Sequence, residues 1–346
     1  MTHHSPRPAR QRPPHTADPL ADSNAEQANR LLARTINLGL NLGAPAEASW
    51  TVQLGSADLN RCAQAGFTAV RLVVSLAQHC SPTDPVQFEP VVLDRINHVI
   101  EGASERGLAV VVANAIDPEL MSDPAGQRDR LIAFARQLAA GLSHHGPAVI
   151  LEPLSEPQGA LDPLWNDYLP GLIGAVREAD TQRTVVIGPR SYNNARFLGE
   201  LTLPDDEQNL VVTIHHYWPI RFTMQGEAWL GSTEVGDPAD WLGTTWDGTP
   251  EQQAELEAGF DAVASYARAR QRPVFVGEFG TTNNADIASR VRWTRFNREL
   301  AERHGLSWGC WSYAPSFSIY DTTRSRWHHD LLDALIPPAT YHASTR

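Results

Sequence analysis

The sequence predicts a single α/β domain, a closed (β/α)8 barrel of the TIM type, and three observations favour that fold. From Thr35 onward, short apolar runs alternate with longer segments of helical period, which is the pattern of repeated βα units. Eight such units can be counted, and a chain of 346 residues has room for one such barrel. No G-x-G-x-x-G or Walker loop follows the first strand, which disfavours an open doubly wound sheet.

The apolar runs have the length and the branched side chains of strands that are buried on both faces. They predict strands over residues 35–41, 68–74, 108–115, 148–154, 184–188, 210–217, 273–279 and 306–313. Helices are expected between them, for example over residues 93–106, 128–143, 164–178, 252–270 and 288–304.

The beginning of the chain differs in composition from the rest. It is rich in Pro, His and Arg and has too little apolar content to fold, so we expect a disordered tail over residues 1–25 and a barrel over residues 30–340. The tail lacks the apolar core of a secretory signal and is too polar to span a bilayer. The sequence as written therefore predicts a cytoplasmic location.

Net charge limits the range of partners. A formal net charge of −12, without a sustained Lys/Arg block in the folded part, argues against binding to nucleic acid or to an anionic membrane. A small molecule or an oligosaccharide is the simpler expectation. The cysteines Cys62, Cys80 and Cys310 are widely spaced and include no C-x-x-C pair, so neither a disulfide framework nor a zinc site is predicted.

Three pairs of adjacent histidines, at 144–145, 215–216 and 328–329, raise the question of a metal. None belongs to an H-E-x-x-H motif, and neighbours on a strand point to opposite faces. We therefore predict no metal and no cofactor.

Polar residues gather at the carboxyl ends of seven predicted strands. A barrel brings these ends to one rim, where barrel enzymes carry their catalytic groups. Each residue alone is explained by a solvated strand end, but the set favours an active site. The residues are Asn41, Arg71, Asn114, Glu156, His215 with Tyr217, Glu278 and Trp311.

Two of these residues are glutamates that should face each other across the barrel mouth, Glu156 after strand four and Glu278 at the end of strand seven. Carboxylates about 5–5.5 Å apart define a retaining glycosidase. Each glutamate also has a simpler explanation. Glu278 could be an ion-pair partner of Arg71, and Glu156 could be a favourable charge at a helix N-terminus. The occurrence of both at one rim favours catalysis.

Several segments together resemble the motifs of glycoside hydrolase family 5, the cellulase family of clan A. The resemblance extends over about residues 35–334, and the set is more specific than any single member. The segments are LEPLSEP at 151–157, VFVGEFG at 274–280, HHYWPIRFTMQGEAW at 215–229, WGCWSYAPSFSIYD at 308–321, GFTAVRLVV at 66–74 and NLGLNLGAPAEASW at 37–50.

The resemblance implies roles for individual residues. Glu156 would be the general acid/base and Glu278 the nucleophile. Arg71 would hold Glu278 ionised, because a nearby guanidinium favours the charged carboxylate. His215 and Tyr217 alternate onto the rim face of their strand, where Tyr217 could donate to Glu278 and His215 could orient the site.

Aromatic residues provide candidate surfaces for a substrate. Trp311 would offer an apolar face to the sugar in the reacting subsite. The long segment 218–250 carries four tryptophans, of which about half should pack the loop onto the barrel. The others, with Trp218 and Trp229 as the candidates, could roof a pocket or stack on a further sugar.

Two positions depart from the family pattern. Ser155 stands where the family has an asparagine that bonds the sugar 2-hydroxyl. Ala115, with Asn114 beside it, stands where the family has a sugar-contacting histidine. The acid/base and nucleophile are kept, but two groups that grip a pyranose are changed, so Ser155 and Asn114 become the candidates for substrate contact.

The sequence therefore predicts a retaining hydrolase of a soluble β-glycoside or a short β-glucan. The alternative is a cellulase-like barrel of specialised metabolism that uses Glu156 and Glu278 as acid and base on a non-sugar substrate, for dehydration, cyclisation or isomerisation. A catalytically silent carbohydrate-binding protein is a third possibility, which the retention of Arg71 and both glutamates disfavours.

Overall fold

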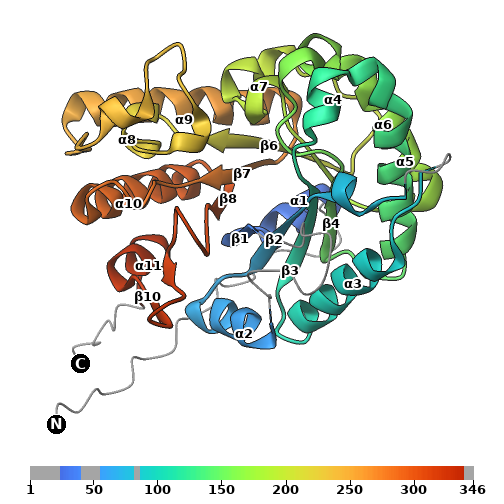
Figure 1. Cartoon of the computed structure of the whole chain (residues 1–346), viewed down its shortest axis with the longest axis horizontal. Coiled ribbons are helices and arrows are strands. Elements are labelled where there is room, and N and C mark those ends of the chain that lie inside the picture. Colours follow the sequence, from blue (N-terminus) through green and yellow to red (C-terminus); the bar gives the residue numbers. More distant parts are fainter. Residues whose placement is uncertain (1–23, 40–54, 82–85, 339–346) are drawn as a thin grey trace.

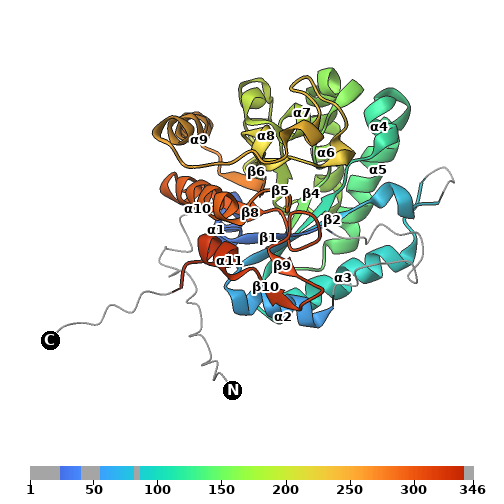
Figure 2. The same cartoon turned by 60° about the vertical axis from the view of Figure 1, so that its left-hand side comes forward.

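The computed structural model describes residues 24–39, 55–81 and 86–338. Eight parallel strands follow one another around a closed barrel, and the eighth pairs with the first (Figure 1). Helices surround the strands in both views (Figure 2). The predicted (β/α)8 fold is confirmed, and each of the eight predicted strands is present.

The strands are shorter than the apolar runs that predict them, by one to four residues. They are β1 (Thr35–Gly39), β2 (Ala69–Val74), β3 (Ala109–Asn114), β4 (Val149–Glu152), β5 (Val185–Ile187), β6 (Leu210–His216), β7 (Val274–Phe279) and β8 (Ser307–Cys310), with a separate hairpin of β9 (Tyr320–Asp321) and β10 (Arg326–Trp327).

All five predicted helices are present within four residues of their expected ends. The α-helices are α1 (Asn24–Leu31), α2 (Ser56–Ala65), α3 (Pro90–Ser104), α4 (Pro118–Ser122), α5 (Pro124–Leu142), α6 (Trp165–Ala179), α8 (Ile220–Thr223), α9 (Pro250–Arg270), α10 (Ile287–Arg303) and α11 (His329–Leu335). The segment α7 (Arg190–Asn193) is a turn with a left-handed backbone. Short 3-10 helices are η2 (Leu76–His79), η3 (Gly159–Leu164), η4 (Ala195–Glu200), η5 (Ala228–Leu230) and η6 (Pro238–Trp241).

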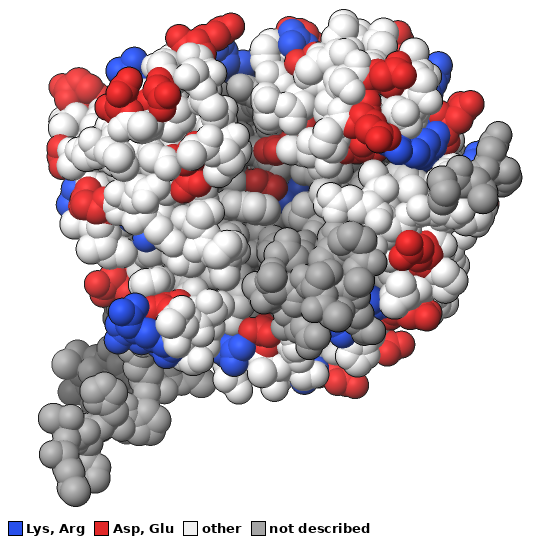
Figure 3. Space-filling view, in the orientation of Figure 1, with Lys and Arg blue, Asp and Glu red and all other residues white. Residues whose placement is uncertain are grey.

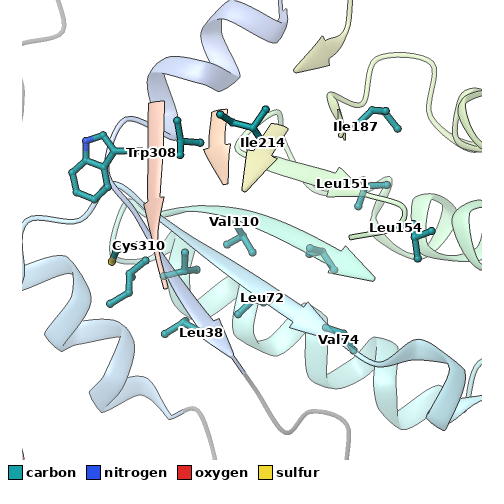
Figure 4. Close-up of a cluster of buried hydrophobic side chains, with 14 of the residues drawn as sticks. Leu38, Leu72, Val74, Val110, Leu151, Leu154, Ile187, Ile214, Trp308 and Cys310 are labelled. Carbon is teal, nitrogen blue, oxygen red and sulfur yellow. The ribbon is translucent and has the colours of Figure 1, made fainter. Parts of the chain in front are cut away.

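Strand residues alternate between two separate cores. The outward residues, among them Leu72, Val110 and Ile214, pack between the strands and the surrounding helices (Figure 4). The inward residues Ala69 and Phe275 belong to a smaller cluster inside the barrel. This alternation follows from the two-residue period of a strand, and it explains why the strands read as continuous apolar runs.

Helix α1 closes the interior cluster at the end of the barrel opposite the rim. Its buried residues Ala25 and Ala28, followed by Leu32, pack against the inward side chains of the strands. The sequence predicts a tail to residue 25 and a barrel from residue 30, and α1 spans Asn24–Leu31, across both limits. The apolar face of α1 consists mainly of alanine and the helix as a whole is polar, so its composition resembles that of the tail before it. The rest of the predicted tail, residues 1–23, lies outside the described residues.

Two irregularities in strand pairing shape the rim. The register of β6 against β7 shifts between Ile214 and His215, so that His215 pairs with Glu278. A second shift follows Val276 in the pairing of β7 with β8. Such irregularities bend a strand and re-aim its side chains, and they are common beside active sites. Here they turn Glu278 toward the barrel mouth.

In the part of the chain that the structure describes, no helix is both long and apolar enough to cross a membrane.

Candidate active site

Figure 3 shows a hollow near the middle of one face of the molecule, with acidic and basic side chains side by side in it. Arg71, Glu156, His215, Tyr217 and Glu278 converge near the carboxyl ends of their strands, as their hydrogen bonds show. Asn41, which was predicted at the same rim, lies outside the described residues.

Glu278 is held at both carboxylate oxygens. Oε1 accepts from Nη1 of Arg71 at 2.6 Å, and Oε2 accepts from the Tyr217 hydroxyl at 2.8 Å. Burial by itself would raise the pKa of Glu278, but the neighbouring His215, the charge of Arg71 and the hydroxyl of Tyr217 outweigh burial and lower that pKa below its ordinary value. Glu278 is therefore an ionised carboxylate in a fixed orientation.

Arg71 uses all five of its N–H donors. Besides Glu278, it donates from Nε and Nη2 to the two oxygens of Glu152, at 2.6 and 2.8 Å. Nη1 also donates to Oδ1 of Asn37, and Nη2 donates to Oγ of Ser155 at 2.8 Å. A buried charge is stable only when it is paired and fully hydrogen-bonded, and this arginine meets both conditions.

Glu156 lies against His215. Nδ1 of His215 is 2.7 Å from Oε1 of Glu156 and 3.6 Å from Oε2 of Glu278. Burial raises the pKa of Glu156, and the negative charge of Glu278 adds to that rise. The two carboxyl groups thus have pKa values shifted in opposite directions, which is how a site keeps one acid and one base at the same pH.

One ligand atom from each of Glu156, His215 and Glu278 lies within 4.8 Å of the others, a spacing that a metal ion could bridge. The guanidinium of Arg71 already contacts Glu278 at 2.6 Å and supplies the positive charge there. A divalent cation would have to approach this arginine against electrostatic repulsion. The arrangement therefore gives no reason to propose a metal.

Three tryptophans lie at or beside the rim. Trp311 is partly buried against the cluster of Met224, Trp241 and Phe317. Trp229 is 66% exposed and donates from its indole nitrogen to Glu227 at 2.5 Å. Trp218 is 48% exposed and donates to Glu255 at 2.8 Å.

The other two tryptophans of segment 218–250, Trp241 and Trp246, are buried, which agrees with the expectation that about half of them pack the loop. The rings of Trp218 and Trp229 are oriented by carboxylates while their faces remain exposed.

The comparisons with known proteins agree with this geometry. Residues 39–316 match the family model "Cellulase (glycosyl hydrolase family 5)". The chain is 35% identical to endoglucanase Cel5A from the hyperthermophilic Thermotoga maritima, with a TM-score of 0.85 over 91% of this chain and 100% of that one. The chain belongs to glycosyl hydrolase family 5.

Longer family members are also similar. Endoglucanase H of Acetivibrio thermocellus is 28% identical over 335 residues, which are 95% of this chain but 35% of that protein. Endoglucanase B of Ruminococcus albus is 24% identical over 80% of this chain and 70% of its own length. The chain thus spans about a third of the length of endoglucanase H. Other structures of the Thermotoga enzyme are complexes with cellobiose and with mannotriose.

The two departures from the family pattern lie in different surroundings. Ser155 is buried, and its oxygen accepts from Arg71. Asn114 is 2% exposed, and its side chain points to the outer face of the barrel, as do those of Val110 and Val112 on β3. Its backbone carbonyl accepts from the N–H of Ser155 at 2.8 Å. Its side chain is therefore poorly placed for a sugar, because alternation turns it away from the barrel axis. By the same alternation, the position of Ala115 faces the barrel axis.

Three residues of the candidate site were not predicted from the sequence. Glu152 is an acid inside an apolar run, a pattern that indicates a buried partner, which is Arg71. Glu227 accepts from Trp229 and from the Thr282 hydroxyl, at 2.5 Å each. Asn193 contacts His215 from the loop after β5. Its sequence context, SYNN, gives no sign of that contact.

Proposed function

We propose that this family 5 chain hydrolyses a soluble β-glycoside or a short β-glucan with retention of configuration, using Glu156 as acid/base and Glu278 as nucleophile. The observation that carries the proposal is the pair of carboxylates, with oxygens within 4.8 Å of each other and pKa values shifted in opposite directions. That separation suits direct attack by one carboxylate better than attack by an intervening water, which needs about 6.5–9.5 Å.

The proposed first step breaks the glycosidic bond. Glu156 donates its proton to the leaving oxygen while a Glu278 oxygen attacks the anomeric carbon, which gives a covalent glycosyl ester and a free aglycone. Arg71 and Tyr217 hold the attacking carboxylate in place through their hydrogen bonds. In the second step, Glu156 takes a proton from a water molecule that attacks the same carbon and releases Glu278.

The substrate class follows from the exposed aromatic faces. Trp218 and Trp229 expose large rings near the rim, and the apolar faces of a sugar ring stack on such surfaces. The endoglucanase relatives and the cellobiose and mannotriose complexes of the Thermotoga enzyme support a β-linked oligosaccharide. Among the described residues, no comparable feature favours the non-sugar alternative.

Variants that separate the two carboxylates test the mechanism. Glu278→Ala should abolish turnover of every glycoside, because no covalent intermediate can form. Glu156→Ala should spare aryl glycosides whose leaving groups need little protonation, while turnover of cello-oligosaccharides falls by about 10²-fold or more.

Added azide gives an independent readout of the same roles. With Glu156→Ala it should attack the glycosyl-enzyme and yield a β-glycosyl azide, whereas with Glu278→Ala it should attack the sugar directly and yield the α-product. Steady-state rates on both substrate types and the configuration of the azide product are the measurements. Equal losses on both substrate types for Glu156→Ala would contradict its role as the acid.

A further inference from the structure

The loop after β5 contains an unusual stretch of backbone. Ser191, Tyr192 and Asn193 have consecutive positive φ values of 57°, 65° and 54°. None is glycine, and a left-handed conformation costs an ordinary residue about 1–2 kcal/mol. The turn is held by the N–H of Ser191, which donates to Asp162 at 2.8 Å, and by the N–H of Tyr192, which donates to the carbonyl of Pro157 at 3.1 Å. Strain of this kind concentrates at functional sites.

The turn places Asn193 beneath the catalytic groups. Asn193 is fully buried, and any side chain at Gly188 would overlap its amide. Its Oδ1 has no hydrogen-bond partner among the described residues, at a cost of about 1–3 kcal/mol. A side chain that served packing alone would gain from losing that oxygen. The left-handed backbone favours asparagine or aspartate at this position, and the amide nitrogen is what distinguishes asparagine from aspartate.

That amide nitrogen contacts the histidine of the site. Nδ2 of Asn193 lies 3.2 Å from Nε2 of His215. An amide nitrogen can only donate, so Nε2 must be the unprotonated, accepting nitrogen of the ring. The ring proton is then on Nδ1, which lies 2.7 Å from Oε1 of Glu156 and donates to it.

The position of this proton determines the state of Glu156. Because Oε1 accepts from His215, the acidic proton of Glu156 must be on Oε2, the only oxygen left to deliver it. With Nε2 engaged by Asn193, His215 is also kept neutral, although the charges around it favour the imidazolium. Burial and the charge of Arg71 on β2 oppose the imidazolium, while Glu278 on β7 and Glu156 after β4 favour it; Tyr217 lies just beyond β6.

We propose that Asn193 is a positioning residue that holds His215 in the neutral tautomer with its proton on Nδ1, and so fixes the proton of Glu156 on Oε2. The tautomer is a property of the folded chain. Its catalytic consequence rests on the proposed function.

The first test measures the tautomer without any substrate. In protein labelled with ¹⁵N-histidine, the His215 resonances should identify Nδ1 as protonated and Nε2 as unprotonated at pH 7. Asn193→Asp keeps the shape and tolerates the left-handed backbone, but its carboxylate accepts from Nε2–H. Both ring nitrogens of His215 should then be protonated. An Nε2 that is already protonated in the natural chain, or an unchanged spectrum in Asn193→Asp, would overturn the proposal.

The second test measures catalysis. An imidazolium beside Glu156 favours its ionised form, so Asn193→Asp should move the basic limb of kcat/KM on cello-oligosaccharides about one pH unit lower. Asn193→Gly suits the backbone and removes the amide, so it should lower kcat on cello-oligosaccharides about 10-fold or more and spare activated aryl glycosides.

Asn194→Asp is the matched control. It adds the same charge one residue away, where the side chain caps η4, and should leave the pH profile in place. An equal loss on both substrate types, or an equal shift in the control, would show that position 193 is merely structural. If the natural chain cleaves no glycoside, the proposed function fails, while the NMR result still decides the tautomer.

Discussion

Arg71 shows how much of this site depends on single side chains. One guanidinium joins four strands, because it binds Asn37 on β1, Glu152 on β4, Glu278 on β7 and the Ser155 hydroxyl beyond β4. A lysine has three donors and no planar fork, so it could not satisfy the same four partners. The same arginine therefore keeps Glu278 ionised and holds the Ser155 hydroxyl in place.

The contacts of Ser155 lead to a prediction for Ser155→Asn. In the natural chain the serine oxygen accepts from Arg71. An asparagine oxygen can take over that bond while its amide nitrogen donates to a sugar 2-hydroxyl, a contact that strengthens in the transition state. We expect kcat/KM on β-glucosides and cello-oligosaccharides to rise by up to about 10²-fold, if about 2–3 kcal/mol of bonding is recovered.

Ser155→Ala is the comparison variant, because it removes the acceptor of Arg71 and adds no donor. It should lower kcat/KM on the same substrates. If Ser155→Asn loses activity on the true substrate, and neither it nor the natural chain cleaves any glycoside, the non-sugar alternative is favoured.

At the scale of elements, the strands were predictable and the turns were not. Runs such as AVRLVV and VFVGEF are recognisable as strands because both of their faces are buried, and β-branched residues suit that position. The rim positions of Glu156 and Glu278 follow from counting strands. The left-handed turn at Asn193 could not be predicted, because its geometry depends on Gly188, Asp162 and Pro157, which are brought together only by the fold.

The strand that carries His215 also presents a second histidine to the opposite layer. His216 stacks on Trp293 of α10 at 6.0 Å and packs edge-on against Phe260 of α9. Its Nε2 is buried without a partner among the described residues. Burial lowers the pKa of His216 to about 4, so the ring is neutral in the folded chain.

His216 should therefore limit stability in acid. Its folded pKa of about 4 lies below the ordinary value of 6.5, so its contribution is complete above pH 6.5 and is lost as the pH falls toward 4. At about 1.4 kcal/mol per pKa unit, the loss reaches at most about 3 kcal/mol. His216→Phe keeps the stacking and removes the titration, so its free energy of unfolding should fall less between pH 7 and pH 4.5.

Urea unfolding at both pH values measures this difference. His98→Phe changes an exposed histidine of α3 and is the control. Identical acid sensitivity in His216→Phe and in the natural chain would contradict the assignment.

Trp229 should contribute to the binding of longer substrates but not of short ones. Trp229→Ala removes an exposed ring that Glu227 orients, so KM for cello-oligosaccharides should rise by about 10-fold, as expected for the loss of one stacking contact. A short aryl glucoside that does not reach the ring should be cleaved as before. Leu242→Ala, an exposed apolar residue of the same segment, is the control. A drop in kcat on the aryl glucoside would instead indicate a distorted site.

The whole molecule works as a barrel with one open and one closed end. The inward side chains at the closed end are apolar, and α1 covers them with Ala25 and Ala28. The polar network of Arg71 lies above this apolar plug and is shielded by it from solvent on that side. A low local dielectric strengthens the ion pairs of a network but makes each unpaired group costly, so the stability of the Arg71 network depends on the apolar cluster below it.

The contribution of the plug can be measured with one residue. Ala28→Gln forces a larger side chain and an unpartnered amide into the barrel interior, and overpacking and polar burial each cost about 1–3 kcal/mol. A chain of this size loses about 2–4 °C in Tm for each kcal/mol, so Tm should fall by roughly 5 °C or more. Glu26→Gln puts the same side chain on the exposed face of the same helix and should change Tm by less than about 2 °C. Differential scanning calorimetry on both variants gives the comparison. Equal Tm values for the two variants would show that α1 does not close this end of the barrel, and the Arg71 network would then have to be stabilised from the rim alone.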